Sequence, residues 1–215
     1  MNDVERKNND FFSKVATSYN VSYLRACEEF LVSHFFKGKV LVLGCGAGRT
    51  LTPLARKGFD VVGIDINQSM VGIAVKTGVP VYCMSATHLE FEDESFDTVF
   101  FPFHGIDYIY PDIYKAVAEA KRVLKKDGVF VMSSHNRFYI KKINQVLNGP
   151  YAHHGDLVTY RTTPFDFFKL RRFFRKVRIF QRISIATSWK NSNWKDKIYR
   201  IFSFFNKSTY FVCFK

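Results

Sequence analysis

The chain has 215 residues, a length that favours one large domain over two. Its hydrophobic fraction of 47% and charged fraction of 24% are those of a folded protein and argue against intrinsic disorder. The net charge of +13 is unevenly distributed, because residues 1–135 carry 15 basic and 16 acidic side chains, whereas residues 136–215 carry 17 and 3. The last 80 residues are therefore the part of the chain that we expect to meet anions.

The sequence gives no sign of a membrane span, a leader or a metal site. It contains no run of 18 apolar residues, which argues against a transmembrane helix, and its polar start, MNDVERKNND, is unlike a signal peptide. The four cysteines show no C-x-x-C spacing, so we expect no zinc and no other metal. These features predict a cytoplasmic protein, and its basic end predicts peripheral attachment to the inner membrane face.

The predicted elements alternate between helices and buried strands. Helical spacing opens the chain in Phe11–Tyr19 and Leu24–Phe35. Five short, nearly continuous apolar runs follow, separated by helix-compatible stretches, and such runs are typical of parallel strands buried on both faces. The expected strands are 39–44, 60–65, 79–84, 96–101 and 128–134, and the expected helices between them are 48–57, 67–76 and 112–125.

The chain beyond residue 135 has a different pattern. Residues 137–147 look helical, residues 148–162 look like a loop or hairpin, and Thr163-Pro164 is a favourable helix start. In 177–185 the apolar residues alternate with arginine, which predicts a strand buried on one side, and 208–215 predicts a last strand. The whole pattern predicts an α/β fold: a doubly wound seven-stranded sheet, mostly parallel with an antiparallel C-terminal strand and helices on both faces.

The most informative stretch is VLVLGCGAGRT, in which a buried strand turns into a helix through Gly44, Gly46 and Gly48. Glycine permits both the sharp turn and the close approach of a ligand. The next strand ends at Asp65, where a carboxylate can accept hydrogen bonds from two ribose hydroxyls. The dinucleotide pattern G-x-G-x-x-G is not matched, because Arg49 occupies its sixth position.

This G-x-G-x-G loop resembles that of class I S-adenosylmethionine (SAM)-dependent methyltransferases. DVVGIDINQSM, YCMSATHLEFEDESFDTVFF and VLKKDGVFVMSS are similar to the family's later elements, in the right order, so the resemblance spans residues 37–134 and implies SAM as cofactor. Ser85 departs from the family, which usually carries an aspartate there for the adenine amino group. The implied cofactor-binding residues are Tyr19, Leu43, Gly44, Cys45, Gly46, Gly48, Asp65, Ile66, Met70, Ser85, Ala86, Thr87, Phe101, Pro102 and Phe103.

The acceptor side carries fewer signals. The segment Phe101–Phe103 lacks the Asn- or Asp-Pro-Pro-aromatic motif of enzymes that methylate exocyclic base nitrogens, which argues against a nucleic-acid base as acceptor. Because histidine titrates near neutral pH, His104, His153 and His154 are candidate general bases, and the alternative for each is a solvated loop residue. We expect His135 to be structural. The expected substrate-binding residues are Asp107, Tyr139, Tyr151, Tyr160 and Arg161.

We expect a single methyltransferase domain over residues 1–215. Its parts are a helical cap (1–36), a SAM-binding core (37–134), an acceptor-lid insertion (136–162) and a basic part that completes the sheet (163–215). The expected function is methyl transfer from SAM to an oxygen or nitrogen of a small, or lipid- or nucleotide-linked, anionic acceptor.

Two alternatives to this function stay open. One is an RNA-modifying methyltransferase that holds RNA through residues 169–182, a run that also fits an anionic membrane surface. The other is a SAM-binding protein without catalysis.

Overall fold

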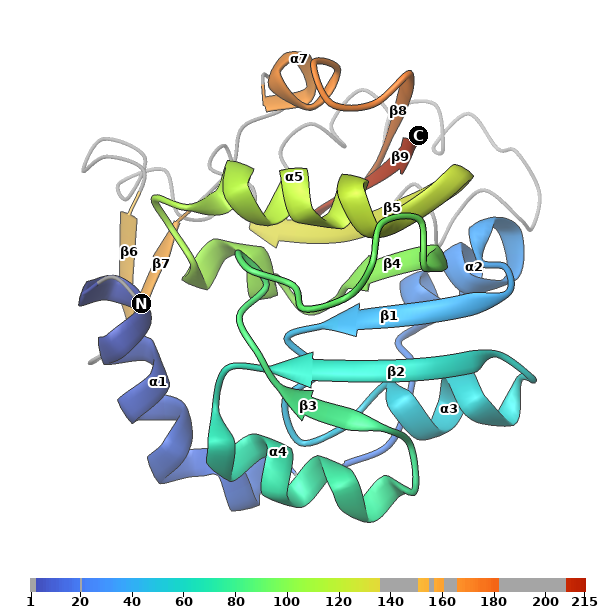
Figure 1. Cartoon of the computed structure of the whole chain (residues 1–215). Coiled ribbons are helices and arrows are strands. Elements are labelled where there is room, and N and C mark those ends of the chain that lie inside the picture. Colours follow the sequence, from blue (N-terminus) through green and yellow to red (C-terminus); the bar gives the residue numbers. More distant parts are fainter. Residues whose placement is uncertain (1–2, 20, 136–150, 155–156, 161–165, 182–207) are drawn as a thin grey trace, which may run out of the picture.

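The structure, a computed structural model, describes residues 3–19, 21–135, 151–154, 157–160, 166–181 and 208–215. Its main sheet has seven strands in the order β3-β2-β1-β4-β5-β9-β8 (Figure 1). The strands β1 to β5 pair in parallel and β9 pairs antiparallel with both β5 and β8, which confirms the predicted fold class. The strands are β1 Lys39–Leu43, β2 Asp60–Asp65, β3 Val81–Cys83, β4 Phe96–Phe101, β5 Leu124–His135, β8 Lys176–Gln181 and β9 Ser208–Phe214.

Helices cover both faces of this sheet. One face packs against α5, and the other packs against α2 and α3. A separate antiparallel hairpin is formed by β6 Tyr151–His154 and β7 Leu157–Tyr160. The helices are α1 Asp3–Val15, η1 Ala16–Tyr19, α2 Ala26–Phe35, α3 Leu51–Arg56, α4 Gln68–Ala74, η2 Val75–Thr77, η3 Gly105–Tyr108, α5 Ile113–Val123 and α7 Asp166–Leu170.

The apolar runs of the sequence are continuous because the central strands are buried on both sides. In β1, Leu41 and Leu43 belong to the core on the α5 face, whereas Val40 and Val42 belong to the core on the opposite face. All four side chains are fully buried. Alternate residues of a strand point to opposite faces, so a strand between two helical layers needs an apolar residue at every position.

Most predicted elements are present, with shifted ends. The strand predicted at 128–134 extends back to Leu124, which pairs with Phe96 of β4, although the polar sequence KKDG inside it resembles a turn. Residues 148–162 were predicted to form a loop or a hairpin, and the structure shows a hairpin there. The predicted helix at 137–147 and the helix start at Thr163 lie outside the described residues. In the parts of the chain that the structure describes, no helix has the length and apolarity needed to cross a bilayer.

The carboxyl ends of the parallel strands share one edge of the sheet. Figure 1 shows the arrowheads of β1, β2 and β5 pointing to the left, where α1 and the β6–β7 hairpin lie. The helix α2 lies at the right, near the start of β1. In open α/β sheets, ligands bind at the carboxyl edge. The elements that follow β1, β2, β4 and β5 are therefore the ones that can build a site.

A substitution at Phe100 can test how the core is packed. Its ring is fully buried and lies edge-on to Phe36, with 5.0 Å between ring centroids. We expect Phe100→Ala to lower the free energy of unfolding by about 3–5 kcal/mol, because the core loses a large side chain and keeps part of the cavity. The matched control is Phe168→Ala on α7, whose side chain is 66% exposed and which we expect to change stability by less than about 0.5 kcal/mol. Urea unfolding measures both, and similar losses would contradict the assigned core.

Candidate functional site

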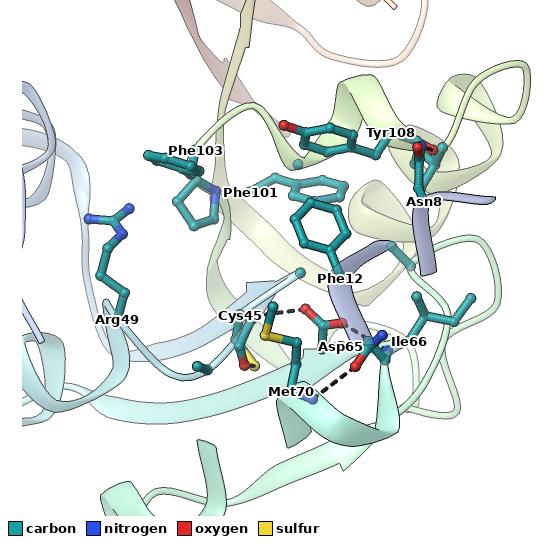
Figure 2. A pocket seen from close by; sticks show the side chains of 18 of the residues that line it. Asn8, Phe12, Cys45, Arg49, Asp65, Ile66, Met70, Phe101, Phe103 and Tyr108 are labelled. Atoms are coloured by element: carbon teal, nitrogen blue, oxygen red, sulfur yellow. Dashed lines mark hydrogen bonds between the residues drawn. The ribbon is translucent and has the colours of Figure 1, made fainter. Parts of the chain in front are cut away.

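A cavity opens at the carboxyl ends of β1, β2 and β4 (Figure 2). Its floor is formed by the glycine loop 44–50 and by residues 65–67, and residues 84–86 extend it beyond β3. The end of β4, residues 101–103, and η3 form one wall, and α1 forms the wall opposite. Segments far apart in the sequence thus enclose one space.

The glycine loop is fixed by a steric requirement at Gly44. This residue has φ +58°, and a β-carbon on it would lie 2.9 Å from Cε2 of Phe101. Only glycine adopts this positive φ without strain and fits beside the Phe101 ring without a shift of β4. The N–H of Gly46, two residues later, donates to Oδ2 of Asp65 at 2.7 Å. The loop therefore rests on the ends of two strands, β4 and β2.

Asp65 is the buried acid at the end of β2. Its second oxygen accepts the N–H of Asn67 at 2.9 Å. Burial raises the pKa of Asp65, and the amide donors of Asn67 and Gly46 offset part of that rise. A carboxylate has about four lone-pair positions, so two backbone donors leave capacity for two ribose hydroxyls. The geometry suits the predicted role of this residue.

Asn67, which sequence reasoning did not single out, joins three elements. Its side chain caps α4 by accepting the N–H of Met70 at 2.9 Å. Its amide group donates to the backbone oxygen and to Oδ1 of Asn9, at 2.9 and 2.8 Å, and so holds α1 over the cavity. The available signal was the N-cap preference for asparagine before a helix. Asn67 closes the cofactor side of the site.

Ser85 lines the cavity but is engaged locally. Its hydroxyl lies 2.8 Å from Oγ1 of Thr87 and accepts the N–H of Thr87 at 3.2 Å. The departure from the family's aspartate therefore leaves a neutral hydroxyl that already has partners in the same turn. Ala86 also lines the cavity.

Aromatic rings form the wall above Asp65. In Figure 2 the rings of Phe12, Phe101 and Tyr108 lie close together, each from a different element. Phe12 and Tyr108 meet edge to face, with 5.3 Å between centroids. Asn8 anchors the same helix by donating from Nδ2 to the backbone oxygen of Tyr108 at 3.0 Å. This wall is thus built from α1, β4 and η3.

A buried ion pair supports the mouth of the cavity. Arg49 donates to both oxygens of Glu28, at 2.8 and 2.7 Å, and the Glu28 side chain is 1% exposed. Burial alone lowers the pKa of Arg49, but the Glu28 carboxylate outweighs that effect and raises it. The guanidinium of Arg25 lies 4.2 Å from the centre of the Phe103 ring, and that of Arg49 lies 5.3 Å from it. Two cations thus flank one aromatic residue at the mouth.

Asp107 and His104 lie beneath the cavity wall. Asp107 is fully buried and does not line the cavity, because its carboxylate turns toward Ser134 and His135 at the end of β5. This position corrects the expected direct contact between Asp107 and substrate. His104 is also buried, with Nε2 2.8 Å from Oγ of Ser208.

The cavity gathers most of the predicted cofactor residues. Leu43, Gly48 and Thr87 do not line it, and Tyr19 lies in η1. Among the acceptor-side residues, His153 and His154 lie in β6, Tyr151 in β6 and Tyr160 in β7, whereas Tyr139 and Arg161 fall outside the described residues. The predicted cofactor residues that line the cavity are Gly44, Cys45, Gly46, Asp65, Ile66, Met70, Ser85, Ala86, Phe101, Pro102 and Phe103. The family resemblance also implies that residues 8–20 close the cofactor site from one side, and Asn8 and Phe12 of that range line the cavity. Sequence reasoning missed the wall residues Glu5 and Tyr108.

Comparison with known proteins finds similarity to methyltransferases. Residues 41–132 match the family model described as a methyltransferase domain. An uncharacterized protein of Methanocaldococcus jannaschii is 33% identical over 148 residues, which cover 65% of this chain and 57% of the relative. The chain spans about half the length of the curated relatives it matches first.

Solved structures share the fold over nearly the whole chain. A SAM-dependent methyltransferase of Thermotoga maritima, described as a possible histamine N-methyltransferase, has 20% identity and a TM-score of 0.66, and 98% of this chain covers 97% of that one. A phosphoethanolamine N-methyltransferase of Haemonchus contortus, solved with S-adenosylhomocysteine, has 16% identity and a TM-score of 0.64, and 96% of this chain covers 57% of that one.

The Arg49–Glu28 pair can be tested against an exposed ion pair whose acid also lies in α2. We expect Arg49→Gln to lower the free energy of unfolding by about 3–5 kcal/mol, because it leaves the Glu28 carboxylate buried and uncompensated. Lys57, which pairs with Glu29 at 2.7 Å with both side chains more than 40% exposed, is the control. Lys57→Gln is expected to cost less than about 1 kcal/mol. Equal losses in urea unfolding would refute a special role for the buried pair.

Proposed function

Because residues 41–132 match a methyltransferase domain model and the fold is shared with a SAM-dependent methyltransferase, we propose that this protein transfers the methyl group of SAM to an oxygen or nitrogen atom of a small acceptor. The observation that carries the proposal is the meeting of three features in one cavity: the glycine loop, the Asp65 carboxylate and a wall of aromatic rings. Each of them serves a different part of a sulfonium nucleoside.

The residues of the cavity fit the cofactor. Gly46 leaves room for close approach, since it lines the cavity and nothing lies within 4 Å of the position a β-carbon would take there. Asp65 is held by two backbone donors with lone pairs left for ribose hydroxyls, and Ile66 and Met84 offer apolar surface for adenine. When bound, SAM supplies an activated methyl group on a positively charged sulfur. The aromatic faces nearby favour such a cation.

The protein's own contribution to the reaction is positioning and exclusion of water. Methyl transfer proceeds by in-line attack, so most of the acceleration comes from holding the nucleophile in line with the methyl group. Phe12 and Tyr108, from α1 and η3, close the space in which this alignment occurs. The hydrogen bonds of Asn67 and Asn8 keep α1 in place.

We propose further that the acceptor carries an anionic group and is a small, or lipid- or nucleotide-linked, molecule. Arg25 supports this proposal, because its guanidinium lies on the Phe103 ring at the mouth and forms no ion pair within the described residues. Arg49, in contrast, is neutralised by Glu28. An arginine held on an aromatic ring presents its donors to phosphate or carboxylate.

A second candidate function is modification of RNA. The segment that forms α7, the turn after it and β8 exposes six basic side chains: Lys169, Arg171, Arg172, Arg175, Lys176 and Arg178. The backbone of RNA, or the surface of an anionic membrane, offers phosphates at a density that suits such a row.

Binding of S-adenosylhomocysteine tests the cofactor assignment. We expect Asp65→Ala to weaken it by about 2–3 kcal/mol, because charge-assisted hydrogen bonds are lost. Only the ionised carboxylate accepts both hydroxyls, and burial raises the pKa of Asp65, so affinity should fall as the pH drops through that raised pKa. Asp65→Asn should remove this pH dependence. Titration calorimetry with S-adenosylhomocysteine and NAD measures the affinities of the wild type and both variants at each pH. A preference of the wild type for NAD would contradict the cofactor assignment.

Salt dependence separates the two functions. If RNA is the substrate, the affinity for a 20-nucleotide polyuridine should fall by about 10³-fold or more between 50 and 200 mM salt, as expected for six or more phosphate contacts. The triple variant Arg171→Gln, Arg175→Gln, Arg178→Gln should then bind weakly, and its affinity for S-adenosylhomocysteine should not change. Under the first proposal, both proteins bind polyuridine equally weakly, already at 50 mM salt. Tight binding at 50 mM salt by the wild type alone would favour RNA.

A further inference from the structure

Exposed apolar side chains gather in the cavity. Among the residues that the structure describes, six large hydrophobic residues are exposed, and three of them, Val21, Tyr23 and Phe103, line this one space. The first two belong to the segment between η1 and α2, whereas Phe103 follows β4. The guanidinium of Arg49 joins the two sides, because it lies 5.1 Å from the centre of the Tyr23 ring and 5.3 Å from that of Phe103. Exposed apolar surface that converges from distant segments is typical of a binding site.

The backbone holds Phe103 in a conformation that costs free energy. The φ angles of Phe103 and His104 are +55° and +63°, a region that residues other than glycine rarely adopt. Hydrogen bonds impose it: the N–H of His104 donates to Oγ of Ser133, and the N–H of Gly105 donates to the backbone oxygen of Pro102, both at 3.0 Å. Phe103 gains little packing in return, since it stays 38% exposed. Strain of this kind is concentrated at functional sites, so the turn presents the Phe103 ring to a ligand.

Two arginines contact that ring, and they differ in charge balance. Arg49 is paired with both oxygens of Glu28. Arg25 lies closer, with its guanidinium 4.2 Å from the centre of the Phe103 ring, and it forms no ion pair within the described part of the chain. A guanidinium held on a ring keeps its N–H donors for an anion. An apolar ring and a positive charge therefore lie side by side at the mouth.

The mouth lies at the end of the cavity where the acceptor has to enter. In Figure 2, Phe103 and Arg49 lie to the left of Asp65, whereas Ile66 and Asn8 lie to its right. A nucleoside with its ribose on Asp65 and its adenine on Ile66 extends its 5′ end to the left. The methyl group of SAM is carried on that end, so the attacking atom must reach it from the side of Phe103.

We propose that Phe103 and Arg25 bind the acceptor, and that the acceptor is a small amphiphilic acid. Its apolar body contacts the rings of Phe103 and Tyr23, and its carboxylate or phosphate accepts hydrogen bonds from Arg25. The inference rests on the proposed function and narrows it, because a sugar phosphate offers the charge without the apolar body and a neutral phenol offers the reverse. It also gives to the acceptor a residue, Phe103, that the family resemblance implies for the cofactor.

Three probes test this chemistry on the full chain saturated with S-adenosylhomocysteine. The first, 2-naphthoate, has an apolar body and a carboxylate; 2-naphthamide is its neutral counterpart, and glycerol 3-phosphate is an anion without an apolar body. We expect 2-naphthoate to bind at least about 10-fold more tightly than either of the others, because it alone makes both contacts. Titration calorimetry measures the three affinities. Equal affinities for 2-naphthoate and 2-naphthamide, or no binding of either, would overturn the proposal.

Matched variants assign the two contacts. Arg25→Gln should abolish the preference for 2-naphthoate over 2-naphthamide, whereas Arg178→Gln, which removes a guanidinium 5.7 Å from the ring of Phe214 and away from the cavity, should not. Phe103→Gly should weaken both naphthalene compounds by about 10-fold without lowering the melting temperature, because glycine adopts a positive φ without strain. Phe103→Leu keeps apolar surface and should stay within about threefold of the wild type. Unchanged binding in Arg25→Gln or in Phe103→Gly would contradict the assignment of that residue.

The cofactor's own carboxylate is the other anion within reach of the mouth. S-Adenosylhomocysteine carries it and 5′-methylthioadenosine does not, so we expect Arg25→Gln to leave the affinities for both unchanged. A loss for S-adenosylhomocysteine alone would assign Arg25 to the cofactor and overturn the inference. If the wild type binds neither nucleoside, the proposed function fails, whereas the preference for 2-naphthoate can still be measured on the free chain. Sedimentation with phosphatidylglycerol vesicles that depends on Phe103, without binding of 2-naphthoate, would overturn a small acceptor in favour of a lipid surface.

Discussion

The ring of Phe101 lies between two glycines, and the site depends on that contact. A β-carbon on Gly44, at the end of β1, or on Gly105, at the start of η3, would clash with this ring. The first glycine begins the cofactor loop, and the second begins the turn that carries Asp107 and Tyr108. Since β1 and β4 are neighbours in the sheet, one aromatic side chain sets the spacing between the glycine loop and η3.

Sheet topology explains how distant residues meet around that ring. The neighbours β4 and β5 are separated in the chain by η3 and α5, and β9 returns antiparallel beside β5. His104, His135 and Ser208 therefore come together from three strand ends, although 104 residues separate the first from the last. Polar side chains buried this deeply must satisfy one another, which is why the group forms a connected network.

The sequence was most informative where backbone geometry dictates residue type. The loop 44–48 and Asp65 could be predicted because glycine and a strand-end carboxylate are required there. The strand β5 was predicted too short, because Lys125–Asp127 looks like a turn until Phe96 pairs with Leu124. The partners of Asp107 could not be predicted, since they depend on strand order and not on local pattern.

The electrostatics of the cavity bear on which acceptors the enclosure can accelerate. The sulfonium of SAM is a cation, and a deprotonated oxygen is an anion, so their charges cancel as the methyl group moves. Phe12, Phe101 and Tyr108 line this space with aromatic rings, a setting in which charge cancellation is favoured over charge separation.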